Sequence, residues 1–210
     1  MDGTRQAEYV LFEGVLRIAS GDLASVASKA KEVFDRGGSS SVLIFDDATG
    51  EQVDVDFSGP IEVVLHRLQR RGFLTAESQP EMQAPRGPGR PKLGVVAHEV
   101  TLLPRHWEWL NEQPGGASVT LRKLVDAARH ANEGNDRVRR SREAAYRFIL
   151  AMAGNLPDFE EATRALFAGD AARFDERIQA WPVGVRDLAR KIATEGLRKL
   201  REPEVGVEDL

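Results

Sequence analysis

The residues best suited to chemistry are arginines that crowd one stretch of the chain: Arg137, Arg139, Arg140, Arg142 and Arg147. Guanidinium groups hold phosphates bidentately, so a cluster of this kind suits nucleic-acid binding. Helical periodicity places Arg140 and Arg147 opposite the apolar side of this stretch, with Arg139 toward the same side. We therefore take Arg139, Arg140 and Arg147 as candidate phosphate ligands. The alternative is a solvated face whose arginines pair with nearby carboxylates.

A second basic segment lies in the Pro- and Gly-rich stretch of residues 75–94. Its Gly-Arg-Pro-Lys sequence at 89–92 resembles the centre of an AT-hook, with Pro88 in place of the usual first Arg. An arm of that kind lies in the minor groove of A·T-rich DNA, and its Arg reaches the groove floor. The alternative is a solvated hinge between domains. The resemblance implies that Arg90 and Lys92 contact DNA, and Arg86 of the same stretch is a further candidate contact.

A strand–helix–helix pattern follows. The pattern predicts a strand over 95–103, a helix that begins at Pro104, and a second helix capped by Ser118. It resembles a ribbon-helix-helix DNA-binding unit over roughly residues 97–131. The resemblance implies a dimer that lays a ribbon of paired strands in the major groove, with a phosphate at the second helix. The alternative is an ordinary strand packed beside two core helices. Candidate contacts here are Thr101, Arg122 and Lys123.

The net charge of −4 conceals a basic centre. Residues 81–150 carry 12 basic and 8 acidic side chains, whereas residues 1–80 carry 8 and 13, and residues 151–210 carry 9 and 12. A basic segment between acidic ends indicates an anionic partner. DNA is the first candidate partner, and the acidic surface of a partner protein is the second.

The sequence offers no recognisable catalytic, cofactor or metal site. Its four histidines form no i, i+4 pair, and neither a Walker loop nor a dinucleotide-binding glycine motif occurs. The absence of cysteine excludes disulfides, thiolate zinc sites, iron–sulfur clusters and a Cys nucleophile. We therefore expect a protein that is not an enzyme and that uses neither a cofactor nor a metal.

The elements that must position these residues predict an α+β fold. Strands are expected at 9–12, 15–18, 42–45 and 52–57, with helices at 22–36 and from 59 onward. The expected domains are an α+β domain at 1–74, a flexible linker at 75–94, a strand with helices at 95–202, and a tail at 203–210. The third range contains the ribbon-helix-helix-like unit and a helical bundle at 136–200, whose first helix ends near residue 153.

The chain carries no apolar run near the roughly 20 residues that a membrane helix needs. Its first residues, 1–5, also lack the basic-then-apolar layout of a secretory signal. A cytoplasmic protein that does not enter the membrane is the expectation.

Two longer stretches indicate a family. Residues 99–110 (EVTLLPRHWEWL) and 115–125 (GGASVTLRKLV) resemble a bacterial family catalogued as a domain of unknown function, number 2239. Residues 166–170 and 178–182 resemble the helical end of the same family. The resemblance spans most of the chain and implies no activity. The sequence as a whole predicts a DNA-binding homo-oligomer, regulatory or nucleoid-associated, and the alternative is a protein-interaction module without nucleic-acid binding.

Overall fold

The computed structural model describes residues 8–37, 40–73, 96 and 98–198. Its strands are β1 (Tyr9–Glu13), β2 (Leu16–Gly21) and β3 (Val42–Asp46). Its helices are α1 (Leu23–Asp35), α2 (Ile61–Arg70), α3 (Pro104–Glu112), α4 (Gly116–Ala153), α5 (Phe159–Ala168), α6 (Ala171–Arg177) and α7 (Val183–Ala193). The α+β class is confirmed. None of the described helices is both long and apolar enough to cross a bilayer.

The strands form one antiparallel sheet in the order β2-β1-β3. β1 and β2 form the expected hairpin, in which Tyr9 lies opposite Gly21 and Glu13 opposite Leu16. The other edge of β1 pairs with β3, where Leu11 lies opposite Ile44. β1 is therefore the central strand, and its apolar run is buried on both faces, as a continuous rather than alternating apolar pattern indicates.

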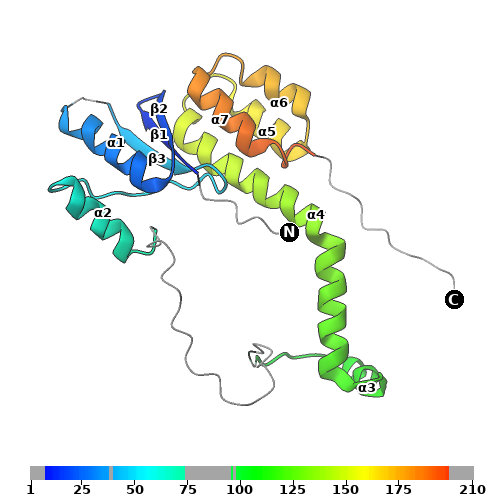
Figure 1. The fold of residues 1–210 in the computed structure, drawn as a ribbon. Coiled ribbons are helices and arrows are strands. Elements are labelled where there is room, and N and C mark those ends of the chain that lie inside the picture. The colour runs from blue at the N-terminus through cyan, green and yellow to red at the C-terminus, as the bar shows by residue number, and fades with distance from the viewer. Residues whose placement is uncertain (1–7, 38–39, 74–95, 97, 199–210) are drawn as a thin grey trace. The chain divides into compact units, whose positions relative to one another are not determined.

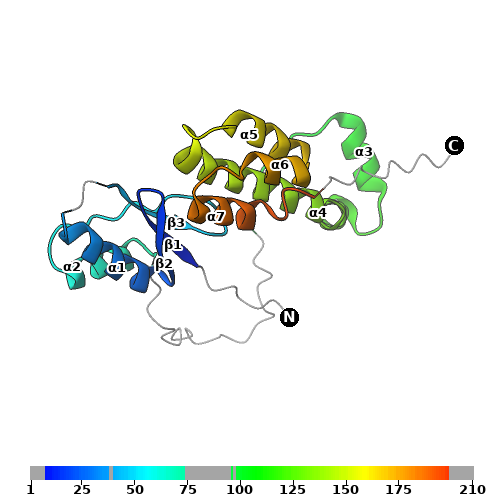
Figure 2. The same cartoon turned by 90° about the horizontal axis from the view of Figure 1, so that it is seen from above.

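The two faces of the sheet belong to different cores. Tyr9, Leu11 and Ile44 pack with the apolar residues of α1 and α2. The alternate residues of β1 and β3 point the other way and pack with α4, α5, α6 and α7. Figures 1 and 2 show this layering, with the sheet between the α1–α2 pair and the helical bundle.

The aromatic centre of the second core joins the two ends of the chain. The ring centroid of Phe148 on α4 lies 5.9 Å from that of Phe12 and 5.0 Å from that of Phe45. This shared core explains why residues 1–76 and 134–210 form one compact unit, with residues 77–133 as the other. The predicted ranges instead separated residues 1–74 from the bundle at 136–200. The predicted linker at 75–94 and tail at 203–210 lie outside the described residues.

Local signals located most, but not all, of the elements of the first 70 residues. α1 begins after Asp22, whose carboxylate accepts a hydrogen bond from the Ser25 amide at 3.0 Å, as expected for a helix cap. The predicted strand at 52–57 is wrong, because only Gln52 forms a bridge, to Phe45. The Val53 amide still donates to the Ile44 carbonyl at 2.8 Å, and Val55 beyond it lies beside Val64 and Leu68 of α2.

The unit of residues 77–133 contains α3 and the first half of α4. The predicted strand at 95–103 is absent from residues 96 and 98–103, which pair with no described strand. Separate helices were predicted over 118–131 and 136–153, and that prediction is wrong, because α4 runs through both without interruption. Gly134 lies inside this helix at a cost of about 1 kcal/mol relative to alanine, which is too small to break it.

Candidate nucleic-acid interface

The second half of α4 places two of the three predicted arginine ligands around one hollow. Arg140 and Arg147 line it together with Arg137 of the same helix, the turn after β3, and Lys191 of α7. The opposite side of this helical segment is buried in the core through Ala145, among other residues. The predicted division of the helix into an apolar face and a basic face is therefore confirmed for this part of α4.

The three predicted arginines differ in how they are held. Arg139 donates to the Asp136 carboxylate at 2.8 Å, and both side chains are exposed. Arg147 donates from Nε and Nη2 to the carbonyl of Thr49, at 3.2 and 2.8 Å. Arg140 is exposed and has neither an ion pair nor a hydrogen bond within the described ranges 8–37, 40–73 and 98–198. Its five donors are therefore open to a phosphate.

Arg142 is buried and serves the fold. Its Nε donates to the carbonyl of Gly196 at 2.7 Å, and Nη2 donates to that of Arg198 at 3.2 Å. Ser141 beside it donates to the carbonyl of Ile192 and accepts from the Gly196 amide. Burial lowers the pKa of the Arg142 guanidinium from its usual value. These bonds hold the chain after α7 against α4 and remove Arg142 from any ligand-binding role.

Lys191 carries an ion-pair network at the edge of the same hollow. Its Nζ binds the buried carboxylate of Asp47 and lies 2.9 Å from the Glu8 carboxylate. The hydrogen bond to Asp47 raises the pKa of Lys191, and the hydrogen bond from Lys191 lowers the pKa of Glu8. These carboxylates neutralise Lys191, and Glu143 and Glu195 also line the hollow. The positive charge most open to a ligand there is therefore that of Arg140.

In the unit of residues 77–133, the predicted contacts Thr101, Arg122 and Lys123 are all exposed. Arg122 donates from Nε to the carbonyl of Ser118 at 3.0 Å, one turn earlier on α4. The predicted ligands Arg86, Arg90 and Lys92 lie outside the described residues.

The same unit exposes many large apolar side chains. Among the described residues of this unit, Leu110 is the buried large apolar side chain. Trp107 and Trp109 are 37% and 49% exposed. Further exposed members are Val96, Val100, Leu103, Leu124 and Val125. A surface so rich in apolar and aromatic groups is typical of a protein–protein interface.

Among the described residues, no three His, Asp or Glu side chains converge. The densest acidic stretch instead serves the turn after β3. Asp46 accepts from the amides of Ala48 and Thr49 at 2.8 and 2.9 Å. The carboxylate of Asp47 forms an ion pair with Lys191.

One protein family matches nearly the whole of the described chain. A family described as "Uncharacterized protein conserved in bacteria (DUF2239)" matches residues 8–193. The chain belongs to the DUF2239 family. No curated protein and no solved structure matches it. The family resemblance predicted from residues 99–110 and 115–125 is confirmed, and the match includes both compact units of the DUF2239 chain.

Two groups in the DUF2239 chain were not predicted from its sequence. Lys191 lies on the charged side of its helix, a pattern that is typical of a solvated face. Its partners Glu8 and Asp47 are far away in sequence. The other group is Arg67, Arg70 and Arg71, whose signal is a concentration of arginine at the C-terminal end of a short predicted helix.

Proposed function

We propose that the DUF2239 chain is a DNA-binding protein, regulatory or nucleoid-associated, that contacts phosphates through its basic central segment. The observation that carries the proposal is Arg140, which is exposed and has no partner among the described residues. It lies beside Arg137 and Arg147 around one hollow. Guanidinium groups placed in this way suit a phosphate backbone better than a neutral ligand. The proposed role is binding in the cytoplasm, without a catalytic step.

The proposal includes a homodimer formed through the unit of residues 77–133. The exposed apolar residues of α3, α4 and the segment before α3 support it, because an isolated chain would leave them in water. Residues 98–103 have no strand partner within the described chain, so pairing with the same segment of a second chain fits the ribbon-helix-helix resemblance. Thr101, Arg122 and Lys123 would then contribute contacts to the groove or to phosphates.

A second candidate function rests on the exposed tryptophans. Trp107 and Trp109 are two residues apart on α3 and remain accessible together. Tryptophan is enriched at the energetic centres of protein interfaces. In this alternative the unit docks on a partner protein, and the arginines of α4 meet acidic side chains rather than phosphates.

Substitutions that remove positive charge from the two basic regions test the DNA proposal. Arg139→Gln/Arg140→Gln should weaken binding to A·T-rich and G·C-rich duplexes alike. It should also reduce the log–log salt slope by about 0.9 for each lost phosphate contact. Arg90→Gln/Lys92→Gln should weaken A·T-rich binding more, if the arm enters the minor groove. Fluorescence anisotropy with matched duplexes measures both effects.

The control for this series is Arg164→Gln/Arg173→Gln. Arg164 of α5 and Arg173 of α6 both pair with Glu161 of α5. The control therefore removes the same amount of positive charge, but from positions outside the basic segment. If this control lost as much affinity as the α4 variant, the effect would be one of net charge and the assignment of Arg139 and Arg140 would be wrong.

A further inference from the structure

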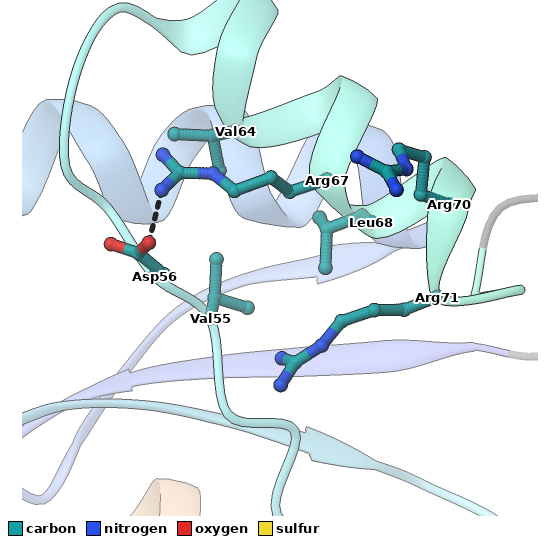
Figure 3. A pocket seen from close by; sticks show the side chains of 7 residues that line it. All are labelled: Val55, Asp56, Val64, Arg67, Leu68, Arg70 and Arg71. Atoms are coloured by element: carbon teal, nitrogen blue, oxygen red, sulfur yellow. Dashed lines mark hydrogen bonds and ion pairs between the residues drawn. The ribbon is translucent and has the colours of Figure 1, made fainter.

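A groove lies between α2 and the extended segment that follows the β3 turn. Its volume is about 390 Å³, within the range of small-molecule sites. The buried side chains of Val64 and Leu68 and the half-buried Val55 form its apolar floor. Figure 3 shows this floor with Arg67 and Arg71 extended on either side of it. The remaining lining residues are Asp56 and Arg70.

Arg67 is fixed in place but retains an unused donor. Its guanidinium binds the Asp56 carboxylate and donates to the Ser58 hydroxyl at 2.9 Å. It also donates to the carbonyl of Ser58. Its Nε is buried and has no hydrogen-bond partner within the part of the chain that the structure describes. An unsatisfied buried donor costs about 1–3 kcal/mol.

The other two arginines are largely uncommitted. Arg71 donates from Nη1 to the carbonyl of Asp54 at 3.2 Å, which leaves its other donors free. Arg70 is exposed and has no ion pair or hydrogen bond among the described residues. Basic residues in the last turn of a helix are common, because they complement the helix dipole. The apolar floor of Val55, Val64 and Leu68 between these arginines goes beyond that ordinary role.

The chemistry of the groove defines its ligand. Three guanidinium groups and one carboxylate line the groove, so the lining carries excess positive charge and favours an anion. The apolar floor favours a hydrocarbon body, whose burial contributes about 25 cal/mol per Å². We propose that the groove binds a small organic anion in which a carboxylate or phosphate is attached to an apolar body. This proposal does not depend on whether the chain binds DNA.

A titration of the full chain with four probes tests the proposal. Hexanoate and hexyl phosphate carry both features, inorganic phosphate carries only the anion, and hexanol only the apolar body. We expect one or both amphipathic anions to shift the backbone amide NMR signals of residues 53–71 saturably. The amphipathic anion that binds should do so at least about tenfold more tightly than inorganic phosphate or hexanol, since tenfold corresponds to about 1.4 kcal/mol. The better of the two identifies the preferred headgroup.

The variant Arg70→Gln/Arg71→Gln should raise the Kd of the preferred probe at least about tenfold, because two charge-assisted contacts are removed. It leaves Arg67 and its bonds to Asp56 and Ser58 intact and removes one exposed hydrogen bond, from Arg71 to the Asp54 carbonyl, so we expect the variant to fold. The control Arg36→Gln removes an exposed arginine at the end of α1, whose Nε donates to the Glu32 carbonyl outside the groove. It should leave the Kd unchanged. The proposal is overturned if neither amphipathic anion shifts these signals, or if both variants bind the probe as the unaltered chain does.

Discussion

Replacing Gly50 by alanine is expected to lower the free energy of unfolding by about 3–4 kcal/mol, the sum of backbone strain and steric overlap. Gly50 has a φ of +65° and closes the turn after β3, where its amide donates to the Asp46 carbonyl. A Cβ atom there would lie 2.0 Å from the carbonyl oxygen of Ala144 on α4. Because that obstacle is backbone, the turn and the helix would have to separate. Urea denaturation of the two chains measures the loss.

Gly59 provides the matched control for this substitution. It also has a positive φ, +82°, but a Cβ there would meet only Val63 atoms at 3.9 Å or more. Gly59→Ala should therefore cost only the strain of the left-handed backbone, about 1–2 kcal/mol. Equal losses for the two variants would mean that the close approach of the turn to α4 does not contribute, contrary to the structure.

The second large effect is expected at Lys191. Lys191→Met should lower the free energy of unfolding by about 2–3 kcal/mol, because it leaves the Asp47 carboxylate buried without its partner. Only 2% of that carboxylate side chain is exposed, whereas Lys191 is 44% exposed, so solvent screening keeps the loss below that of a fully buried pair. Adding Asp47→Asn to the variant should restore much of the loss, as a double-mutant cycle would show.

The difference in stability between the original chain and Lys191→Met should depend on pH at both ends of the range. The pKa of Lys191 is raised above 10.5, so its contribution is present below that pH and is lost as pH rises through the folded-state pKa. The pKa of Glu8 is lowered below 4.5, so its contribution is present above that pH and is lost as pH falls through the folded-state pKa. A difference that is greatest at pH 4 or below would contradict this network.

Sequence patterns predicted well those features that depend only on residues near one another in the chain. The cap at Asp22 and the spacing of Leu23, Val26 and Ala30 located α1, because a helix start and a buried stripe depend on near neighbours. The alternation of polar and apolar residues at 52–57 led to a wrong strand prediction. A segment that packs its apolar side chains into the core of α1 and α2 shows the same pattern without forming a strand. The predicted break between two helices near Gly134 was also wrong. The free-energy cost of one glycine in a helix is smaller than the stability that the rest of α4 provides.

The arrangement of the candidate site depended on contacts distant in sequence. Periodicity correctly placed Arg140 and Arg147 on the outer face of α4. It could not show that Arg147 would bind the Thr49 carbonyl, or that Lys191 would meet Asp47 across more than a hundred residues. It separated Arg142 from the outer arginines, but it could not show which groups would bind its guanidinium, because those carbonyls come from the chain after α7.

Sedimentation velocity of the full chain with a short labelled duplex, over a salt series from about 50 to 200 mM, tests the proposed function most directly. The DNA-binding account predicts that the chain sediments as a dimer and carries the duplex with it. The logarithm of the binding constant should fall linearly with the logarithm of salt, by about 0.9 per neutralised phosphate. A duplex that sediments alone at the lowest salt would contradict DNA binding, and a dimer in that same experiment would favour the protein-interaction function.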